Sequence, residues 1–160
     1  MQENSAFCEK QHFRQWWLWS ILIFVLGVSI YNFTDSLEYF STGELIASSS
    51  VSVIIFILFF IIKLETKIDE LGIRVRFFPF HLQFRYFQWK NVEKAFIREY
   101  SPITEYGGWG LRGGMFGNGK AYNISGNIGL QLVFKDGKKL LIGTQKSEEI
   151  NQFLAEIKKT

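Results

Sequence analysis

Two uninterrupted apolar stretches in the first third of the chain constrain its fold more than any other feature. They run from Trp16 to Phe33 and from Leu45 to Ile62, and neither contains a charged residue. Each has 18 residues, and such a helix is about 27 Å long, close to the roughly 30 Å hydrocarbon core of a bilayer. A chain of 160 residues has too little protein to cover two helices that are apolar on every side. We therefore predict a transmembrane hairpin over residues 16–62, with helices at 16–33 and 45–62, preceded by an N-terminal cytoplasmic tail over residues 1–15.

The charges beside these stretches predict their orientation. Lys10 and Arg14 precede the first stretch and Lys63 and Lys67 follow the second, whereas the connector over residues 34–44 carries acidic charges only. Lys and Arg are enriched in the loops on the cytoplasmic side of a membrane. We therefore expect an integral membrane protein with both termini in the cytoplasm.

The remainder of the chain, residues 63–160, has the pattern of a β-rich domain. Apolar and polar residues alternate, or aromatic and β-branched residues gather, over residues 73–77, 81–89, 92–100, 130–134 and 140–142. The pair Asp136-Gly137 between the last two segments predicts a hairpin with a two-residue turn.

A C-terminal helix is predicted over residues 147–158. Ser147 is a favourable N-cap, and Ile150, Phe153, Leu154 and Ile157 form one apolar stripe at helical spacing. Such a stripe must pack against another element, so we expect the helix to cover one end of the β structure.

This order of elements resembles the bacterial pleckstrin-homology-like (PH-like) membrane proteins, in which two spans precede a β-barrel with a C-terminal helix. The residues that carry the resemblance are the two apolar stretches, KIDELGIRVRFFPF at 67–80, WKNV at 89–92 and SEEINQFLAEI at 147–157. The segment YSPITEYGGWGLRGG at 100–114 looks like a hallmark of one subgroup of these proteins. The resemblance implies a PH-like antiparallel β-barrel capped by a C-terminal α-helix, located at a bacterial inner or plasma membrane. It implies a binding or assembly module and supplies no catalytic residues.

The glycine-rich stretch over residues 107–119 is the first candidate for a binding surface. Its sequence matches two phosphate-binding motifs, G-x-G-x-x-G and G-x-x-x-x-G-K. The first motif needs a helix after it, and none is predicted here. The second needs Ser or Thr at the next position, where this chain has Ala121. Aromatic and Arg residues are enriched in interface hot spots, so we predict Tyr106, Trp109 and Arg112 as contacts with a protein partner. The alternative is that the loop folds back onto the barrel.

A second candidate surface is basic. Residues 63–160 contain 16 basic and 10 acidic residues, a net charge of +6. Lys67, Arg74 and Arg76 resemble the basic pattern with which some eukaryotic PH domains hold phosphoinositide headgroups, and Arg74 and Arg76 share one strand face. They are the candidate residues for an anionic lipid, although the pattern favours an ordinary solvated surface over a lipid site.

Residues suited to catalysis are scarce. Residues 63–160 contain His81 as their single histidine, Cys8 is the only cysteine, and no Ser lies in a G-x-S-x-G motif. We therefore predict no catalytic, metal or cofactor site and no nucleic-acid partner. The sequence favours a membrane-anchored module that engages a protein partner or a second copy of itself at the cytoplasmic membrane face. The alternative is recognition of anionic lipid headgroups by the basic barrel face.

Overall fold

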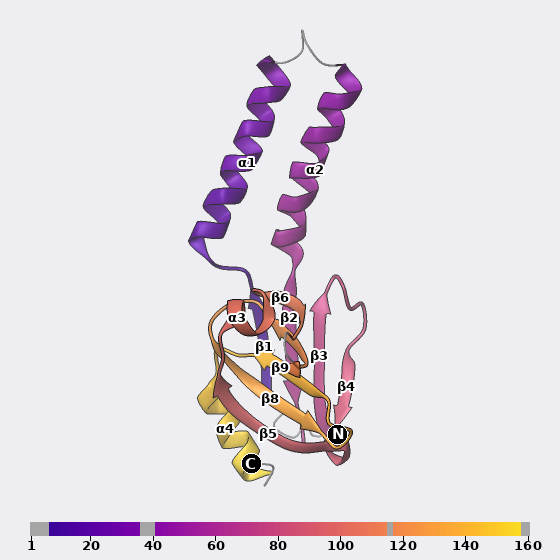
Figure 1. The fold of residues 1–160 in the computed structure, drawn as a ribbon, viewed down its shortest axis with the longest axis vertical. Coiled ribbons are helices and arrows are strands. Elements are labelled where there is room, and N and C mark those ends of the chain that lie inside the picture. The colour runs from indigo at the N-terminus through magenta and orange to yellow at the C-terminus, as the bar shows by residue number, and fades with distance from the viewer. Residues whose placement is uncertain (1–6, 36–40, 115–116, 158–160) are drawn as a thin grey trace. The chain divides into compact units, whose positions relative to one another are not determined.

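The computed structural model describes residues 7–35, 41–114 and 117–157, which form two compact units. Of these residues, 13–62 belong to a helical unit, and 7–12 together with 63–157 belong to a β unit (Figure 1). The β unit is therefore built from both sides of the helical segment in the sequence.

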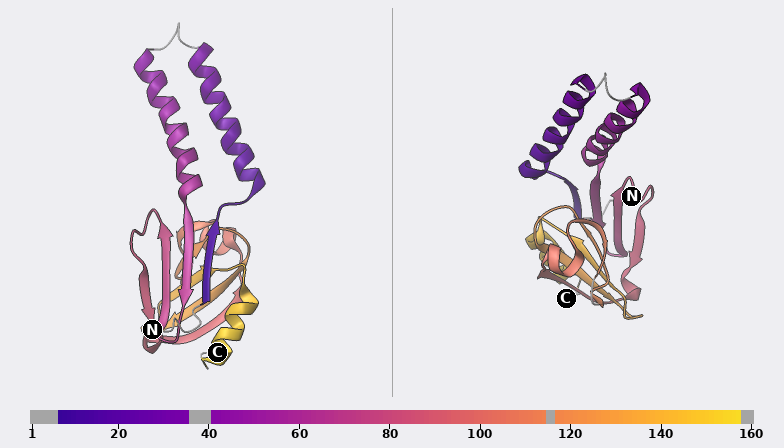
Figure 2. Two further views of the ribbon diagram at one scale, coloured as in Figure 1. Left: turned by 180° about the vertical axis from the view of Figure 1, so that it is seen from behind. Right: turned by 45° about the horizontal axis from the view of Figure 1, so that its top comes forward.

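The helical unit is a pair of antiparallel helices that lie side by side. They are α1 (Trp16–Asp35) and α2 (Thr42–Ile61) (Figures 1 and 2). The hydroxyl groups of Ser29 and Ser52 lie 2.7 Å apart and share a hydrogen bond between the helices. Small side chains at these positions let the two helices approach closely.

The structure supports one of the two predicted membrane spans. Among the described residues, Trp16–Thr34 forms a helix that is long and apolar enough to cross a membrane. Within α2, the described apolar part is shorter, Ser49–Ile61. Large apolar side chains nevertheless stay exposed on both helices, including Phe24 on α1 and Phe60 on α2.

Four antiparallel strands form the first sheet of the β unit, in the order β1-β2-β3-β4. The strands are β1 (Phe7–His12), β2 (Lys63–Ile68), β3 (Gly72–Phe78) and β4 (Arg85–Gln88). Strand β3 was predicted, whereas the strand predicted over residues 81–89 is shorter, because only its second half pairs with β3.

Strand β1 lies in the segment that the sequence predicts as a tail. It pairs with β2 in a register that begins with Phe7 opposite Ile68 (Figure 2, left). Its inward-facing residues after Phe7 are Glu9 and Gln11, so the alternation is not one of apolar and polar residues. The usual sequence signal of a half-buried strand is therefore missing.

Five strands form the second sheet, in the order β5-β8-β9-β7-β6. The strands are β5 (Val92–Glu99), β6 (Gly110–Gly113), β7 (Lys120–Asn123), β8 (Ile128–Phe134) and β9 (Lys139–Gly143). All neighbours are antiparallel except β7 and β9, which run parallel. A 3₁₀ turn, η1 (Trp89–Asn91), leads from β4 into β5, and the short helix α3 (Pro102–Tyr106) precedes β6.

The predicted closed, wholly antiparallel barrel is wrong. Among the described residues, no strand of the first sheet pairs with a strand of the second, so the β unit consists of two separate sheets. The hairpin of β8 and β9 is confirmed, but four residues, 135–138, separate the two strands. Within this connection Phe134 N donates to Lys138 O and Gly137 N donates to Phe134 O. Gly137 takes a φ of 81°, which glycine adopts without strain.

The predicted C-terminal helix is confirmed as α4 (Ser147–Glu156), which packs against β1, β5 and β8. Ile150, Phe153 and Leu154 are buried, as the apolar stripe predicts. Ser147 is the first helical residue rather than the N-cap, which is Lys146. The rest of the core comes from the inward faces of the two sheets, with fully buried side chains such as Leu64 and Leu130.

Candidate functional site

The β unit has a cleft where the edge of β4 faces the hairpin of β8 and β9. It consists of two adjoining pockets of about 430 and 440 Å³, both lined by Phe87, Phe134 and Lys138. We call it the interlayer cleft, and its other lining residues are Arg85, Tyr86, Asn91, Gly114, Gly117, Gly119, Lys120, Tyr122, Lys135, Asp136, Gly137, Lys139 and Leu140. Each pocket falls within the range of about 300 to 1,000 Å³ that small-molecule sites occupy.

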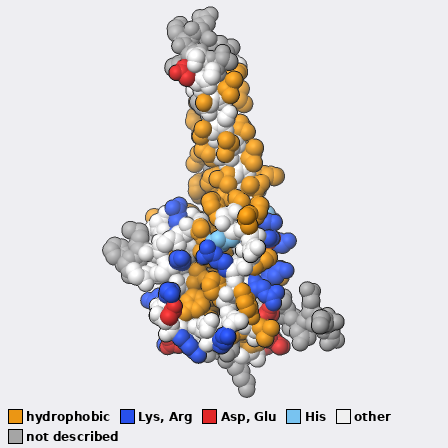
Figure 3. Space-filling model, turned by 90° about the vertical axis from the view of Figure 1, so that its right-hand side faces the viewer, with side chains coloured by type: hydrophobic (Ala, Val, Ile, Leu, Met, Phe, Trp, Pro, Cys, Tyr) orange, Lys and Arg blue, Asp and Glu red, His pale blue; other side chains and the backbone are white. Residues whose placement is uncertain are grey.

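Positive charge surrounds this cleft. Five of its lining residues are basic and one, Asp136, is acidic; the basic residues are Arg85, Lys120, Lys135, Lys138 and Lys139. Figure 3 shows Lys and Arg side chains spread over this side of the β unit, with apolar side chains exposed between them. The Asp136 carboxylate accepts a 2.7 Å hydrogen bond from Lys138 Nζ, which lowers the pKa of Asp136 and raises that of Lys138. Four positive charges therefore remain in excess around the cleft.

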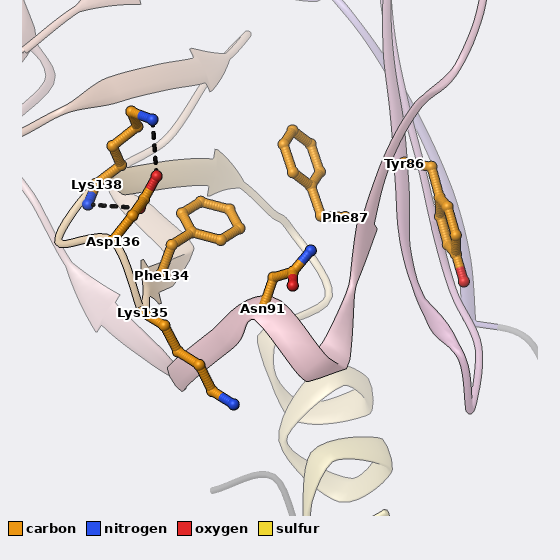
Figure 4. A pocket seen from close by; sticks show the side chains of 7 residues that line it. All are labelled: Tyr86, Phe87, Asn91, Phe134, Lys135, Asp136 and Lys138. Atoms are coloured by element: carbon orange, nitrogen blue, oxygen red, sulfur yellow. Dashed lines mark hydrogen bonds and ion pairs between the residues drawn. The ribbon is translucent and has the colours of Figure 1, made fainter.

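The floor of the cleft is aromatic. The rings of Phe87 and Phe134 lie with their centroids 5.5 Å apart and their planes inclined by 43°. Figure 4 shows the two side chains pointing toward one another from β4 and from the end of β8, with Asn91 below them. Tyr86 projects from the other side of β4, where its ring lies beside Arg74. The cleft thus combines an apolar floor with a cationic rim.

A hydrogen-bonded pair connects the two sides of the cleft. Arg85 Nη1 on β4 donates to the hydroxyl oxygen of Tyr122 on β7 at 3.0 Å. The His81 ring packs edge-on against Tyr122, with centroids 5.3 Å apart. His81 is 8% exposed, and its Nδ1 has no hydrogen-bond partner within the described part of the chain. Burial lowers the pKa of His81, and the positive charges of Arg85 and Lys120 lower it further.

In the described parts of the glycine-rich stretch, residues 110–113 pair with β7, and Gly114, Gly117 and Gly119 line the cleft. Gly114 N donates to Gly119 O at the base of the loop. Gly119 has a φ of 79°, and a Cβ there would overlap the backbone of Lys139, so only glycine lets the loop approach β9 this closely. Residues 115 and 116 lie outside the described residues.

The three predicted partner-binding residues have different environments. Tyr106 is 2% exposed, and its hydroxyl accepts a 3.1 Å hydrogen bond from Arg98 Nη2, so it belongs to the core. Trp109 is half-buried and donates from Nε1 to Gly126 O at 3.0 Å. Arg112 is exposed, and its Nε donates to Trp109 O. Of the three, Arg112 offers the most surface to a partner.

The three predicted lipid-binding residues lie on the first sheet, outside the interlayer cleft. Arg74 forms a 2.8 Å ion pair with Asp69, and Lys67 lies over the Phe84 ring. Arg76 is paired with the buried Glu65, and it also lies over the Phe84 ring.

The ion pair with Arg76 keeps the buried Glu65 charged. Burial would raise the pKa of Glu65, but hydrogen bonds from Arg76 and Lys63 outweigh burial, and the pKa is lowered. The carboxylate therefore stays charged next to the guanidinium. Both arginines of the predicted lipid site are thus paired with acids, unlike the lysines at 120 and 139 in the cleft, which have no ion pair among the described residues.

Comparisons with known proteins give no family for this chain. No protein-family model matches it, and no curated protein matches it significantly. The resemblance to PH-like membrane proteins stays a prediction. Among the described residues, no group of three or more His, Cys, Asp or Glu side chains could hold a metal ion.

Proposed function

We propose that this chain is a membrane-anchored binding module whose ligand site is the interlayer cleft and whose ligand is an anionic amphiphile such as an anionic lipid. The observation that carries the proposal is the composition of the cleft, an aromatic floor beneath five basic residues and one acidic residue. A cleft lined by charges of one sign concentrates ligands of the opposite sign. An apolar floor adds affinity for a ligand that also has an apolar part. The proposed role is binding, and no reaction is assigned to the cleft.

The proposed anchor is the helical unit, with both helices crossing the bilayer. At 20 residues, α2 is about 30 Å long, so it matches the bilayer core in length. Its charged residue, Glu44, lies in the first turn and forms a capping box with Ser41, which suits a helix end at the membrane surface. Basic residues lie before the start of α1 and after the end of α2, and acidic residues occupy the connector between the helices. This distribution supports cytoplasmic termini.

The experiment that tests the cleft measures lipid binding to the full chain, purified in dodecyl maltoside, by native mass spectrometry. Dioleoyl phosphatidylglycerol is the anionic probe and dioleoyl phosphatidylcholine the zwitterionic one. We expect retention of phosphatidylglycerol over phosphatidylcholine, and its loss in a double variant, Lys120→Gln with Lys139→Gln. Each neutralised charge removes about 1 kcal/mol of attraction, so the double variant weakens binding by more than about tenfold.

The matched control is Lys90→Gln with Lys94→Gln, which removes the same charge from exposed positions outside the cleft. This control should retain phosphatidylglycerol as the unchanged chain does. Equal losses in both double variants would mean unspecific attraction and would exclude the cleft as the site. A loss in Lys67→Gln with Arg74→Gln alone would move the site to the first sheet.

A second candidate function is self-assembly through the surface of α3 and β6. Ile103 is 65% exposed and Leu111 is 40% exposed, beside the exposed Arg112. In addition, β6 is an edge strand, with β7 as its one neighbour in the described sheet. An open strand edge with apolar side chains is a template for pairing with another chain. The occupant proposed for this edge is a second copy of the protein.

A further inference from the structure

The interlayer cleft has two chemically different halves. The half around Phe87 and Phe134 is apolar, and its rim of Lys135, Asp136 and Lys138 sums to a charge of only +1. Because Asp136 already accepts from Lys138 at 2.7 Å, this half does not need an anion. It is suited to the apolar part of a ligand.

The other half concentrates the charge that lacks a partner. Arg85, Lys120 and Lys139 line it from β4, β7 and β9, and none of them has an ion pair among the described residues. Arg85 bonds to the hydroxyl of Tyr122, which lies two residues from Lys120 on the same face of β7. The hydroxyl accepts from Arg85 and keeps its own proton to donate. Three cations and one hydroxyl donor therefore face the same space.

Backbone geometry adds to this half. Gly117 and Gly119 line it, with φ values of 81° and 79°. Turns that include left-handed residues form concavities of backbone N–H groups that bind anions. Such turns can approach a ligand closely because glycine has no side chain.

We propose that the cleft takes an organic phosphate, with the phosphate among Arg85, Lys120 and Lys139 and the apolar part between Phe87 and Phe134. This inference rests on the proposed function and names the chemistry of its anion. A phosphate monoester carries a charge of about −1.5 to −2 and three acceptor oxygens, so it can meet three cations and a hydroxyl together. A carboxylate carries a single negative charge and two oxygens, and it would leave more of the positive charge uncompensated than a phosphate monoester does. The phosphate can belong to a lipid or to a soluble molecule.

The test compares four probes on the full chain in dodecyl maltoside, by native mass spectrometry and titration calorimetry. They are 1-oleoyl lysophosphatidic acid, phenyl phosphate, sodium oleate and inorganic phosphate. We expect the lysophosphatidic acid to bind at least about tenfold more tightly than oleate, which has the same acyl chain and a carboxylate. The variant Lys120→Gln with Lys139→Gln should lose this preference, and Lys90→Gln with Lys94→Gln should keep it.

The two phosphate esters distinguish the sources. Tight binding of lysophosphatidic acid with little binding of phenyl phosphate assigns a lipid, and comparable binding of both assigns a soluble organic phosphate. Either result upholds the inference, provided that inorganic phosphate binds more weakly than the esters. Inorganic phosphate that binds as tightly as the esters would show that the apolar half contributes nothing and would overturn the inference.

Failure of the inference and failure of the proposed function give different results. If oleate binds as tightly as lysophosphatidic acid and both depend on Lys120 and Lys139, the cleft binds anions without preferring phosphate. The inference is then wrong and the proposed function stands. If no anionic probe depends on these lysines, both are wrong. Because the lysines are exposed, their replacement should leave the melting temperature unchanged, and this is measured for each variant.

Discussion

Gln11 and Gly143 are joined by a buried hydrogen bond of 2.7 Å, from the side-chain amide of Gln11 to the backbone carbonyl of Gly143. Next to this bond, the Glu9 carboxylate accepts from Thr144 Oγ1 at 2.6 Å and from Gln145 N at 2.8 Å. These bonds tie β1, at the start of the chain, to the end of β9. They make β1 an integral strand of the β unit.

The first prediction follows from this connection. Glu9→Ala leaves Thr144 Oγ1 and Gln145 N without their acceptor in a region that is largely shielded from water, which costs about 1 to 3 kcal/mol of folding free energy. We expect a lower melting temperature for the full chain in dodecyl maltoside. The exposed neighbour Cys8 provides the control, since Cys8→Ala should change little. Equal melting temperatures for Glu9→Ala and the unchanged chain would contradict the role of β1.

The sequence predicts the elements that have a local apolar period. The charge-free stretch from Trp16 predicts α1, the alternation at 73–77 predicts β3, and the stripe of Ile150, Phe153 and Leu154 predicts α4. Each pattern can be read locally, because residues that face the same surroundings recur at the spacing that the element sets.

Relations between distant residues could not be predicted in this way. Glu9 and Gln11 are polar but buried, because their partners near Thr144 come from the other end of the chain. The cleft depends likewise on Phe87 meeting Phe134 and on Arg85 meeting Tyr122. The cluster of lysines at 135, 138 and 139 was visible in the sequence, but nothing local indicates what it faces.

The second prediction concerns pH and His81. Its pKa in the folded chain is lowered from the ordinary value of 6.5 by burial and by the charges of Arg85 and Lys120, so the unfolded chain takes up the proton first. Stability is therefore full above about pH 6.5 and falls as the pH decreases below it. We expect His81→Gln to reduce the loss of melting temperature between pH 7.5 and 5.5 in the full chain. A loss as large in His81→Gln as in the unchanged chain would show that His81 is not the titrating group.

The third prediction separates the core from the assembly surface. Tyr106→Phe removes the hydrogen bonds between the Tyr106 hydroxyl and both Arg98 Nη2 and Asn118 O, and should cost about 1 kcal/mol of stability. Arg112→Ala should leave the melting temperature unchanged, because Arg112 is exposed. If the α3–β6 surface pairs two copies, Arg112→Ala and Leu111→Ser shift the full chain toward monomer in light scattering. If light scattering gives a monomer mass for the unchanged chain, self-assembly through this surface is excluded.

The fourth prediction is the topology. Cys8 is exposed on β1 and is the only cysteine, so it reports on the side of the membrane that holds the β unit. An impermeant maleimide should spare Cys8 in intact cells and modify it after lysis. In a Cys8→Ser background, Ser36→Cys should be modified in intact cells; Ser36 lies outside the described residues, in the acidic connector. Labelling of Cys8 in intact cells would show that the orientation is opposite to the predicted one. Labelling of neither position before lysis would contradict the prediction of two spans.

Lysine footprinting on the unmodified full chain tests the central claim, that the interlayer cleft binds an anionic amphiphile, most directly. The chain in dodecyl maltoside is acetylated with dioleoyl phosphatidylglycerol or with dioleoyl phosphatidylcholine, and the rate at each lysine is read by peptide mass spectrometry. The account predicts that phosphatidylglycerol slows acetylation of Lys120 and Lys139 several-fold while Lys90 and Lys94, which are also exposed to solvent, react as before. Uniform slowing at all four lysines, or protection at Lys67 alone, would contradict it.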